Sequence, residues 1–278
     1  MPLNSAIGQI RILPSALVLV AALGLGACQT KNAALNSDPL ASDPISTGSL
    51  GTSSALSPKQ EIGSFRRTQE LARQWNANQG NVPLGLEYAA NLQKMGQTDQ
   101  QIEVLKSISV GHPNDGPLQS KLGKQLLTAG RIGEATAMLE RAAAQPGVDW
   151  KTLSALGTAY DQQGNYTQAR AKYQQALSLK PSELSIENNM AMSYALEGKL
   201  PDAEKLLRSA MTQPGVDAQP RVRQNLALVV GLQGRFDEAR QIASADLPPE
   251  QVEANLNYLQ QMLAQPNTWQ QLSKQNQG

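Results

Sequence analysis

The chain has 278 residues, and its 24 lysine and arginine residues almost balance its 23 aspartate and glutamate residues. This balance, with only 4% aromatic residues, argues against nucleic-acid binding, which needs excess positive charge and stacking surfaces. The single cysteine excludes a disulfide within the chain, and a single histidine without a cysteine pair provides no usual zinc-ligand set. We therefore expect no metal, no cofactor and no small-molecule substrate.

The first 27 residues have the pattern of a secretory signal peptide. They contain one charged side chain, Arg11, followed by an apolar run over residues 12–25 that is too short to cross a bilayer. The run ends in the letters LGAC at residues 25–28, which resemble the lipobox of bacterial lipoproteins. That resemblance implies lipidation of Cys28 and, because Gln29 follows instead of aspartate, sorting to the outer membrane. The alternative is an ordinary cleaved signal peptide with an incidental cysteine.

Residues 28–60 are rich in Ser, Pro, Gly, Asp and Ala and contain no aromatic residue. A segment of this composition cannot bury enough apolar surface to offset the entropy lost on ordering. We predict a disordered tether that spaces the folded part from the membrane.

A 34-residue period dominates the rest of the chain. Gly96, Gly130, Gly164 and Gly198 follow one another at steps of 34 residues, and Gly234 comes two residues late. This is the length of the tetratricopeptide (TPR) helix-turn-helix unit, and glycine suits the left-handed residue that ends its first helix. We therefore predict an all-α fold, a right-handed superhelical solenoid of TPR units, which presents a binding surface and not a catalytic pocket.

The unit at 150–183 agrees best with the TPR pattern, because the small residues Gly157 and Ala169 stand where its two helices must approach closely. Asp149 and Asp217 each end a QPGVD segment and are predicted helix N-caps. In the first unit, Gln101 replaces the expected small residue. The predicted units are 82–115, 116–149, 150–183, 184–217 and, in degenerate form, 220–253.

Single helices are predicted to cap both ends of the array. Residues 61–81 hold Phe65, Leu71 and Trp75 at helical spacing, in the register of a second helix. At the other end a helix is predicted over 249–264, so that residues 254–278 comprise a C-terminal cap and a Gln-rich tail with Trp269 as a docking anchor.

The sequence favours binding over catalysis. No predicted helix contains a histidine, and no glycine-rich phosphate loop follows a strand, so we expect no enzyme activity. TPR arrays turn the first helix of each unit towards a groove, and the alternatives for its polar residues are partner binding, solvation, or links between neighbouring helices. A carboxylate clamp is not expected, because its lysine and asparagine positions hold other residues. The candidate groove residues are Lys151, Ser154, Thr158, Asp161, Asn188, Asn189, Met192, Arg221, Gln224 and Asn225.

A lipobox, a Ser/Pro tether, about five TPR units and a Leu-rich end helix together resemble the TadD lipoproteins of tight-adherence (Flp) pilus assembly. The most similar segments are QNLALVVGLQGRFDEAR at 224–240 and ANLNYLQQMLAQP at 254–266. The resemblance implies an outer-membrane lipoprotein whose TPR domain faces the periplasm, binds a pilus or secretion protein, and assists secretin assembly or localisation. Alternatives are an adaptor for peptidoglycan enzymes or outer-membrane protein assembly, and a periplasmic enzyme with an unrecognised site.

Overall fold

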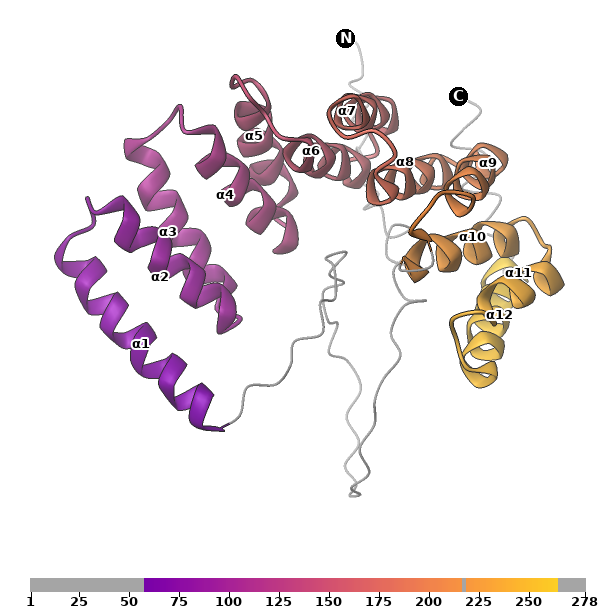
Figure 1. The fold of residues 1–278 in the computed structure, drawn as a ribbon, viewed down its shortest axis with the longest axis horizontal. Helices are drawn as coiled ribbons and strands as arrows, with labels where there is room; N and C mark the ends of the chain where they lie inside the picture. Colours follow the sequence, from indigo (N-terminus) through magenta and orange to yellow (C-terminus); the bar gives the residue numbers. More distant parts are fainter. Residues whose placement is uncertain (1–57, 217–218, 265–278) are drawn as a thin grey trace, which may run out of the picture. The chain divides into compact units, whose positions relative to one another are not determined.

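The computed structural model describes residues 58–216 and 219–264, with side chains described from residue 65 onwards. The predicted signal peptide, the lipobox cysteine, most of the predicted tether, Asp217 and Trp269 lie outside this part of the chain. The described residues form twelve helices and no strand. Consecutive helices lie side by side in chain order (Figure 1).

The helices alternate between first and second members of helix pairs, as the sequence predicts. From α2 to α10, each first helix packs on the second helix of its own pair and on the second helix that precedes it. Helix α12 packs on α11, and from α4 onwards neighbouring first helices also touch. The first helices are α2 (Val82–Lys94), α4 (Gly116–Thr128), α6 (Trp150–Gln162), α8 (Leu184–Leu196), α10 (Pro220–Leu232) and α12 (Pro249–Ala264). The second helices are α1 (Pro58–Ala77), α3 (Thr98–Gly111), α5 (Ile132–Ala143), α7 (Tyr166–Leu179), α9 (Leu200–Met211) and α11 (Phe236–Ala243).

The periodic glycines end the first helices in the conformation predicted for them. All five have φ between 68° and 84°, a region that costs other residues steric strain. After Gly164, for example, the N–H of Asn165 donates to the carbonyl of Tyr160 at 2.9 Å, which is the helix-ending bond of the Schellman motif. At the opposite helix end, Asp149 accepts from the N–H of Thr152 at 2.6 Å and confirms the predicted N-cap of α6.

The two helices of a unit touch where the sequence places small residues. A Cβ atom added to Gly157 would lie 2.6 Å from Cε1 of Tyr173, a side chain that is 1% exposed. Ala169 is fully buried in the same core. The previous unit repeats the contact, since a Cβ atom on Gly123 would lie 2.7 Å from Cγ of Leu139. The predicted close approach is confirmed.

The capping helices differ in detail from their predicted forms. Helix α1 buries Leu71 and Trp75, but Phe65 is 52% exposed and contributes little to the core. Helix α12 has the predicted bounds, and Leu259 packs where a Cβ atom on Gly231 would stand. It starts inside the range assigned to the last unit because α11 is only eight residues long.

We predict that Gly157→Ala destabilises the chain by roughly 1–3 kcal/mol, because the added methyl group overlaps the Tyr173 ring. Gly133→Ala is the matched control, since Gly133 is an exposed helical glycine with open space around its Cβ position. Alanine has the higher helix propensity, so the control should be neutral or stabilising. Urea unfolding of both variants checks the prediction, and equal stability of the two would contradict it.

A second prediction concerns Gln101, which is 0% exposed and whose side-chain oxygen and nitrogen have no hydrogen-bond partner. Ala135, Ala169 and Ala203 are fully buried at the corresponding place in later units. Gln101→Met keeps the length of the side chain and removes both unpaired atoms. We expect a stability gain of about 1 kcal/mol or more, measured as a rise in Tm. Gln100→Met on the exposed face should leave Tm almost unchanged, and a fall in Tm for Gln101→Met would refute the argument.

Candidate functional site

The candidate groove residues lie on three neighbouring first helices, α6, α8 and α10, which contact one another in sequence. The structure therefore brings residues from three repeat units onto adjoining helices. Lys151 and Arg221 are exposed. The partly exposed members are Thr158, Asn189, Met192, Gln224 and Asn225.

Three of the candidates are buried: Ser154, Asp161 and Asn188 are 9%, 5% and 4% exposed. Asn188 lies at the seam between α8 and α10, where its Oδ1 accepts from Nδ2 of Asn225 at 2.8 Å. Of the alternatives given for the groove residues, Asn188 therefore takes the link between neighbouring helices and is not accessible in the groove. Neighbouring first helices pack closely enough to cover it, so its amide links repeat units.

Asp161 is the centre of a buried polar network that joins α6, α7 and α8. Its Oδ2 accepts from the hydroxyl of Tyr173 at 2.8 Å, and its Oδ1 accepts from the hydroxyl of Ser193 at 2.6 Å. Burial raises the pKa of Asp161 to about 6, against the opposing effects of these hydrogen bonds and of the nearby Arg170 charge. A satisfied buried carboxylate of this kind holds adjacent units in register.

Arg170 on α7 extends the same junction. Its Nη1 lies 2.7 Å from Oε2 of Glu197, the residue that follows α8, and its guanidinium lies 4.4 Å from the centre of the Tyr194 ring. Arg170, Tyr194 and Ser193 were not among the candidate groove residues chosen from the sequence. A polar residue at a repeat position that is usually buried could have indicated this junction in the sequence. That these side chains are covered became evident only from the packing of the helices.

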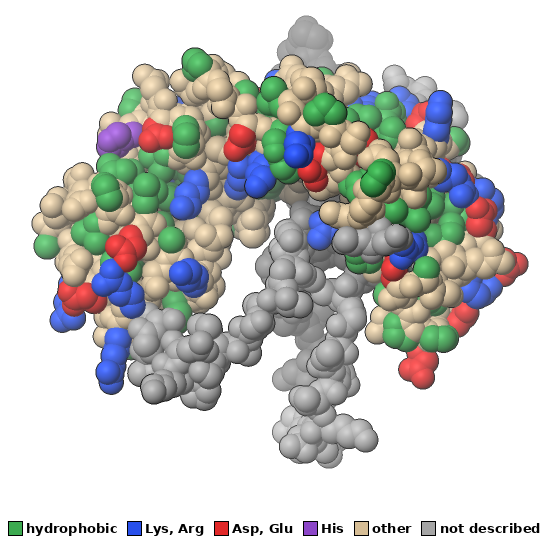
Figure 2. All heavy atoms as spheres, in the orientation of Figure 1, with side chains coloured by type: hydrophobic (Ala, Val, Ile, Leu, Met, Phe, Trp, Pro, Cys, Tyr) green, Lys and Arg blue, Asp and Glu red, His purple; other side chains and the backbone are tan. Residues whose placement is uncertain are grey.

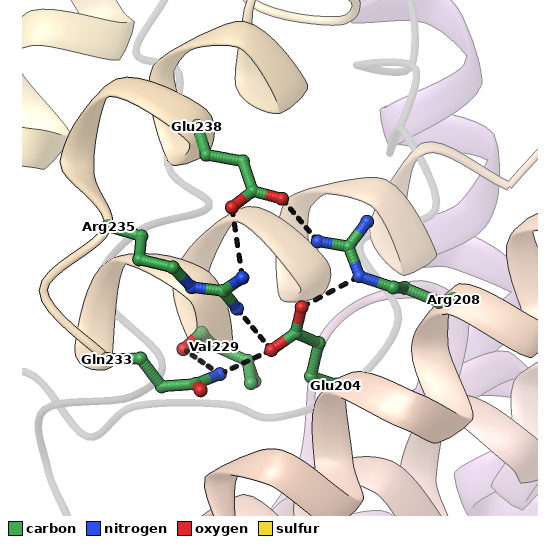
Figure 3. A network of polar contacts seen from close by, with 6 residues as sticks. All are labelled: Glu204, Arg208, Val229, Gln233, Arg235 and Glu238. Atoms are coloured by element: carbon green, nitrogen blue, oxygen red, sulfur yellow. Dashed lines mark hydrogen bonds and ion pairs between the residues drawn. The ribbon is translucent and has the colours of Figure 1, made fainter.

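A second charged network lies on the second-helix side of the C-terminal units (Figure 3). Glu204 of α9 accepts from Arg208 at 2.7 Å, from Gln233 at 2.8 Å and from Arg235, and both arginines also pair with Glu238 of α11. The hydrogen bond from Arg235 is the main cause that lowers the pKa of Glu204 to about 2. This network ties α9 to the turn between α10 and α11 and to α11 itself.

The described residues contain neither a set of metal ligands nor a membrane-spanning helix. Residues 58–216 and 219–264 contain no cluster of three potential His, Cys, Asp or Glu ligands. None of the described helices is long and apolar enough to span a membrane. Basic and acidic side chains are interspersed over the visible surface of helices α9 to α12 (Figure 2), consistent with the balanced composition of the chain.

Comparisons with known proteins agree with this architecture. Residues 150–183 and 220–245 match sequence profiles of the tetratricopeptide repeat family, whereas no curated protein sequence matches the chain. Among solved structures, PilW, a type IV pilus biogenesis factor, is 18% identical with a TM-score of 0.57, covering 71% of this chain and 93% of its own.

Two other solved structures show the same likeness. YrrB, a TPR protein with an unusual peptide-binding site, is 13% identical with a TM-score of 0.52 over 70% of this chain and 99% of its own. MamA is 21% identical with a TM-score of 0.52 over 58% of this chain and 94% of its own. At these identities the likeness is one of fold: the described chain is an array of TPR helix pairs, an architecture suited to holding proteins.

We predict that Asp161 makes the stability of the array depend on pH. Because its pKa is higher in the folded chain than the ordinary 3.8, protonation stabilises the fold. This contribution is complete below about pH 4 and is lost as the pH rises through about 6. In Asp161→Asn this contribution to the pH dependence should vanish. The free energy of unfolding of wild type, relative to that of the variant, should therefore fall by about 2–3 kcal/mol between pH 4 and pH 7.

Urea unfolding of wild type and Asp161→Asn across this pH range provides the measurement. Asp202→Asn changes an exposed aspartate at the start of α9 and serves as the control. It should follow wild type at every pH. Parallel curves for wild type and Asp161→Asn would show that Asp161 does not carry the effect.

Proposed function

We propose that the chain is an outer-membrane lipoprotein whose first-helix groove binds a protein of a pilus or secretion machine, and so assists secretin assembly or localisation. The observation that carries this proposal is the row of neighbouring first helices α6, α8 and α10, which present partly exposed amide and apolar side chains. The fold likeness to PilW, described as a pilus biogenesis factor, and the sequence resemblance to TadD lipoproteins both support it.

The accessible groove side chains suit an extended segment of a protein. Asn189 and Gln224 are partly exposed on adjacent first helices, and an amide can both donate to and accept from a peptide backbone. Met192 lies one helical turn after Asn189 on α8, partly exposed and packed against the core of the C-terminal units. Its unbranched thioether side chain adapts to apolar partner residues.

The lipobox-like sequence at residues 25–28 supports the proposed membrane attachment. Two or more acyl chains anchor a protein far more firmly than one, so lipidated Cys28 would keep the groove close to outer-membrane partners. The predicted tether would let the helical array move on the order of 30 Å from its anchor.

The proposal predicts that loss of the gene lowers the number of surface pili and of secretin multimers in the native bacterium. Wild type should restore both, whereas Cys28→Ser should restore neither and should not incorporate an alkyne fatty acid. The double variant Asn189→Ala with Gln224→Ala should restore them poorly, because each lost amide contact weakens binding by about 0.5–1.5 kcal/mol. Pilus counts by electron microscopy and immunoblots of secretin multimers give the readout.

The matched control is Gln168→Ala with Gln174→Ala, which removes two exposed amides from second helix α7. This control should complement fully, and circular dichroism should show equal helix content in both double variants. Normal piliation and normal secretin multimers after deletion would reject the pilus proposal and favour an adaptor for cell-wall or outer-membrane assembly enzymes.

A further inference from the structure

The first helices α4 and α6 carry a cluster of lysines. Lys121 and Lys124 are three residues apart on α4, so they lie on one helix face, and both are partly exposed. Lys151 stands at the start of α6, exposed, with its ammonium group 5.4 Å from the centre of the Trp150 ring. These three residues are called the lysine cluster below. Two of its members were not among the candidates chosen from the sequence.

A buried hydrogen bond fixes the two helices against each other at this place. The hydroxyl groups of Ser120 and Thr152 lie 2.6 Å apart, and this pair joins α4 directly to α6. Ser120 precedes Lys124 by one helical turn, and Thr152 follows Lys151 immediately. The backbone positions of Lys124 and Lys151 are therefore held together before any partner arrives, which reduces the entropy lost on binding.

The charges of Lys124 and Lys151 act on one another and on Asp149. Burial is the main cause that lowers the pKa of Lys124, and repulsion from Lys151 lowers it further. The ammonium group of Lys124 forms no hydrogen bond or ion pair with the described residues. An ammonium group that is partly removed from water without a hydrogen-bonded anion is in an unfavourable position.

The negative charge of Asp149 does not fully compensate the positive charge of the lysine cluster. Its carboxylate is the N-cap of α6 and accepts from the N–H of Thr152 at 2.6 Å. One such carboxylate faces two ammonium groups, and the third lysine adds another positive charge to the same helices. Elsewhere in the described chain, basic residues such as Arg131, Arg208 and Arg235 are paired with glutamates.

We propose that the lysine cluster binds side-chain carboxylates of an extended, acidic segment of the partner protein. This inference rests on the proposed function and adds the chemistry of the partner to it. Carboxylates of the segment would supply the hydrogen-bonded anions that Lys124 and Lys151 lack. The amides of Asn189 and Gln224, on the next first helices α8 and α10, would contact the continuing backbone.

The test uses the purified full chain and a fluorescently labelled glutamate-rich peptide, acetylated and amidated so that its termini carry no charge. Fluorescence anisotropy should show binding that weakens as salt increases, because the contacts are between charges. A peptide with glutamine at each glutamate position should bind at least about tenfold more weakly, as expected for the loss of charged hydrogen bonds.

Lys124→Gln with Lys151→Gln should weaken binding of the acidic peptide by a similar factor. Lys180→Gln with Lys205→Gln is the matched control, because it removes the same charge from exposed lysines outside the first helices. It should bind like wild type. Equal binding of the acidic peptide by both double variants, or equal binding of the acidic and glutamine peptides by wild type, would overturn the proposal.

Two further measurements distinguish binding of side-chain carboxylates from binding of a chain terminus, and a failure of this inference from a failure of the proposed function. A glutamine peptide with a free terminal carboxylate should bind no better than its amidated form, and tight binding of the free form alone would assign the cluster to chain termini instead. If the acidic peptide fails to bind but the wild-type chain still captures the secretin from crosslinked cells, the proposed function stands and the acidic partner does not. If the acidic peptide binds in the cluster-dependent manner but deletion leaves piliation normal, the cluster is confirmed and the pilus assignment fails.

Discussion

The structure depends on one close contact, the approach of the first helix of each unit to its second helix. In the best-formed unit this contact is Gly157 against the ring of Tyr173, with no room for a single extra methyl group. Because a unit of two helices cannot bury its apolar face alone, the separation of its helices also decides how the next unit packs. A change in this separation would therefore disturb the neighbouring seams as well.

The seams between units contain polar contacts that apolar packing alone would not specify. Asp161 joins α6, α7 and α8 through two hydroxyl groups, while Ser120 meets Thr152, and Asn188 meets Asn225. Each such contact is satisfied in one relative position of the helices and loses its partner when they slide. Buried polar networks that are fully satisfied give rigidity and a unique arrangement. They keep the first helices in register and so define the surface that a partner meets.

Ion pairing differs between the networks on the second helices and the lysines on the first helices. On the second-helix side, Glu204 and Glu238 are shared between Arg208 and Arg235, and the N-terminal units repeat the scheme with Lys106, Arg131 and Glu134. These networks link successive second helices and leave little charge unpaired. On the first-helix side, Lys124 and Lys151 share a single nearby carboxylate, that of the helix cap. These networks neutralise charge where units are joined, whereas Lys124 and Lys151 retain charge on the first helices that a partner could neutralise.

The sequence by itself determined the repeat length, the glycine turns, the Asp149 cap and the close approach at Gly157, because each depends on local backbone geometry or on one repeated contact. It also determined the helix that closes the C-terminal end, whose apolar stripe is a local pattern. Only the tertiary structure decided which groove residues meet solvent. Asn188 and Asn189 are neighbours in sequence and both bond across a seam, yet Asn188 is 4% exposed and Asn189 is partly exposed. That difference depends on how closely α8 and α10 pack, and helix–helix distances follow from the summed volumes of side chains on several helices. The exposure of Phe65 and the lysine cluster between α4 and α6 were decided in the same way.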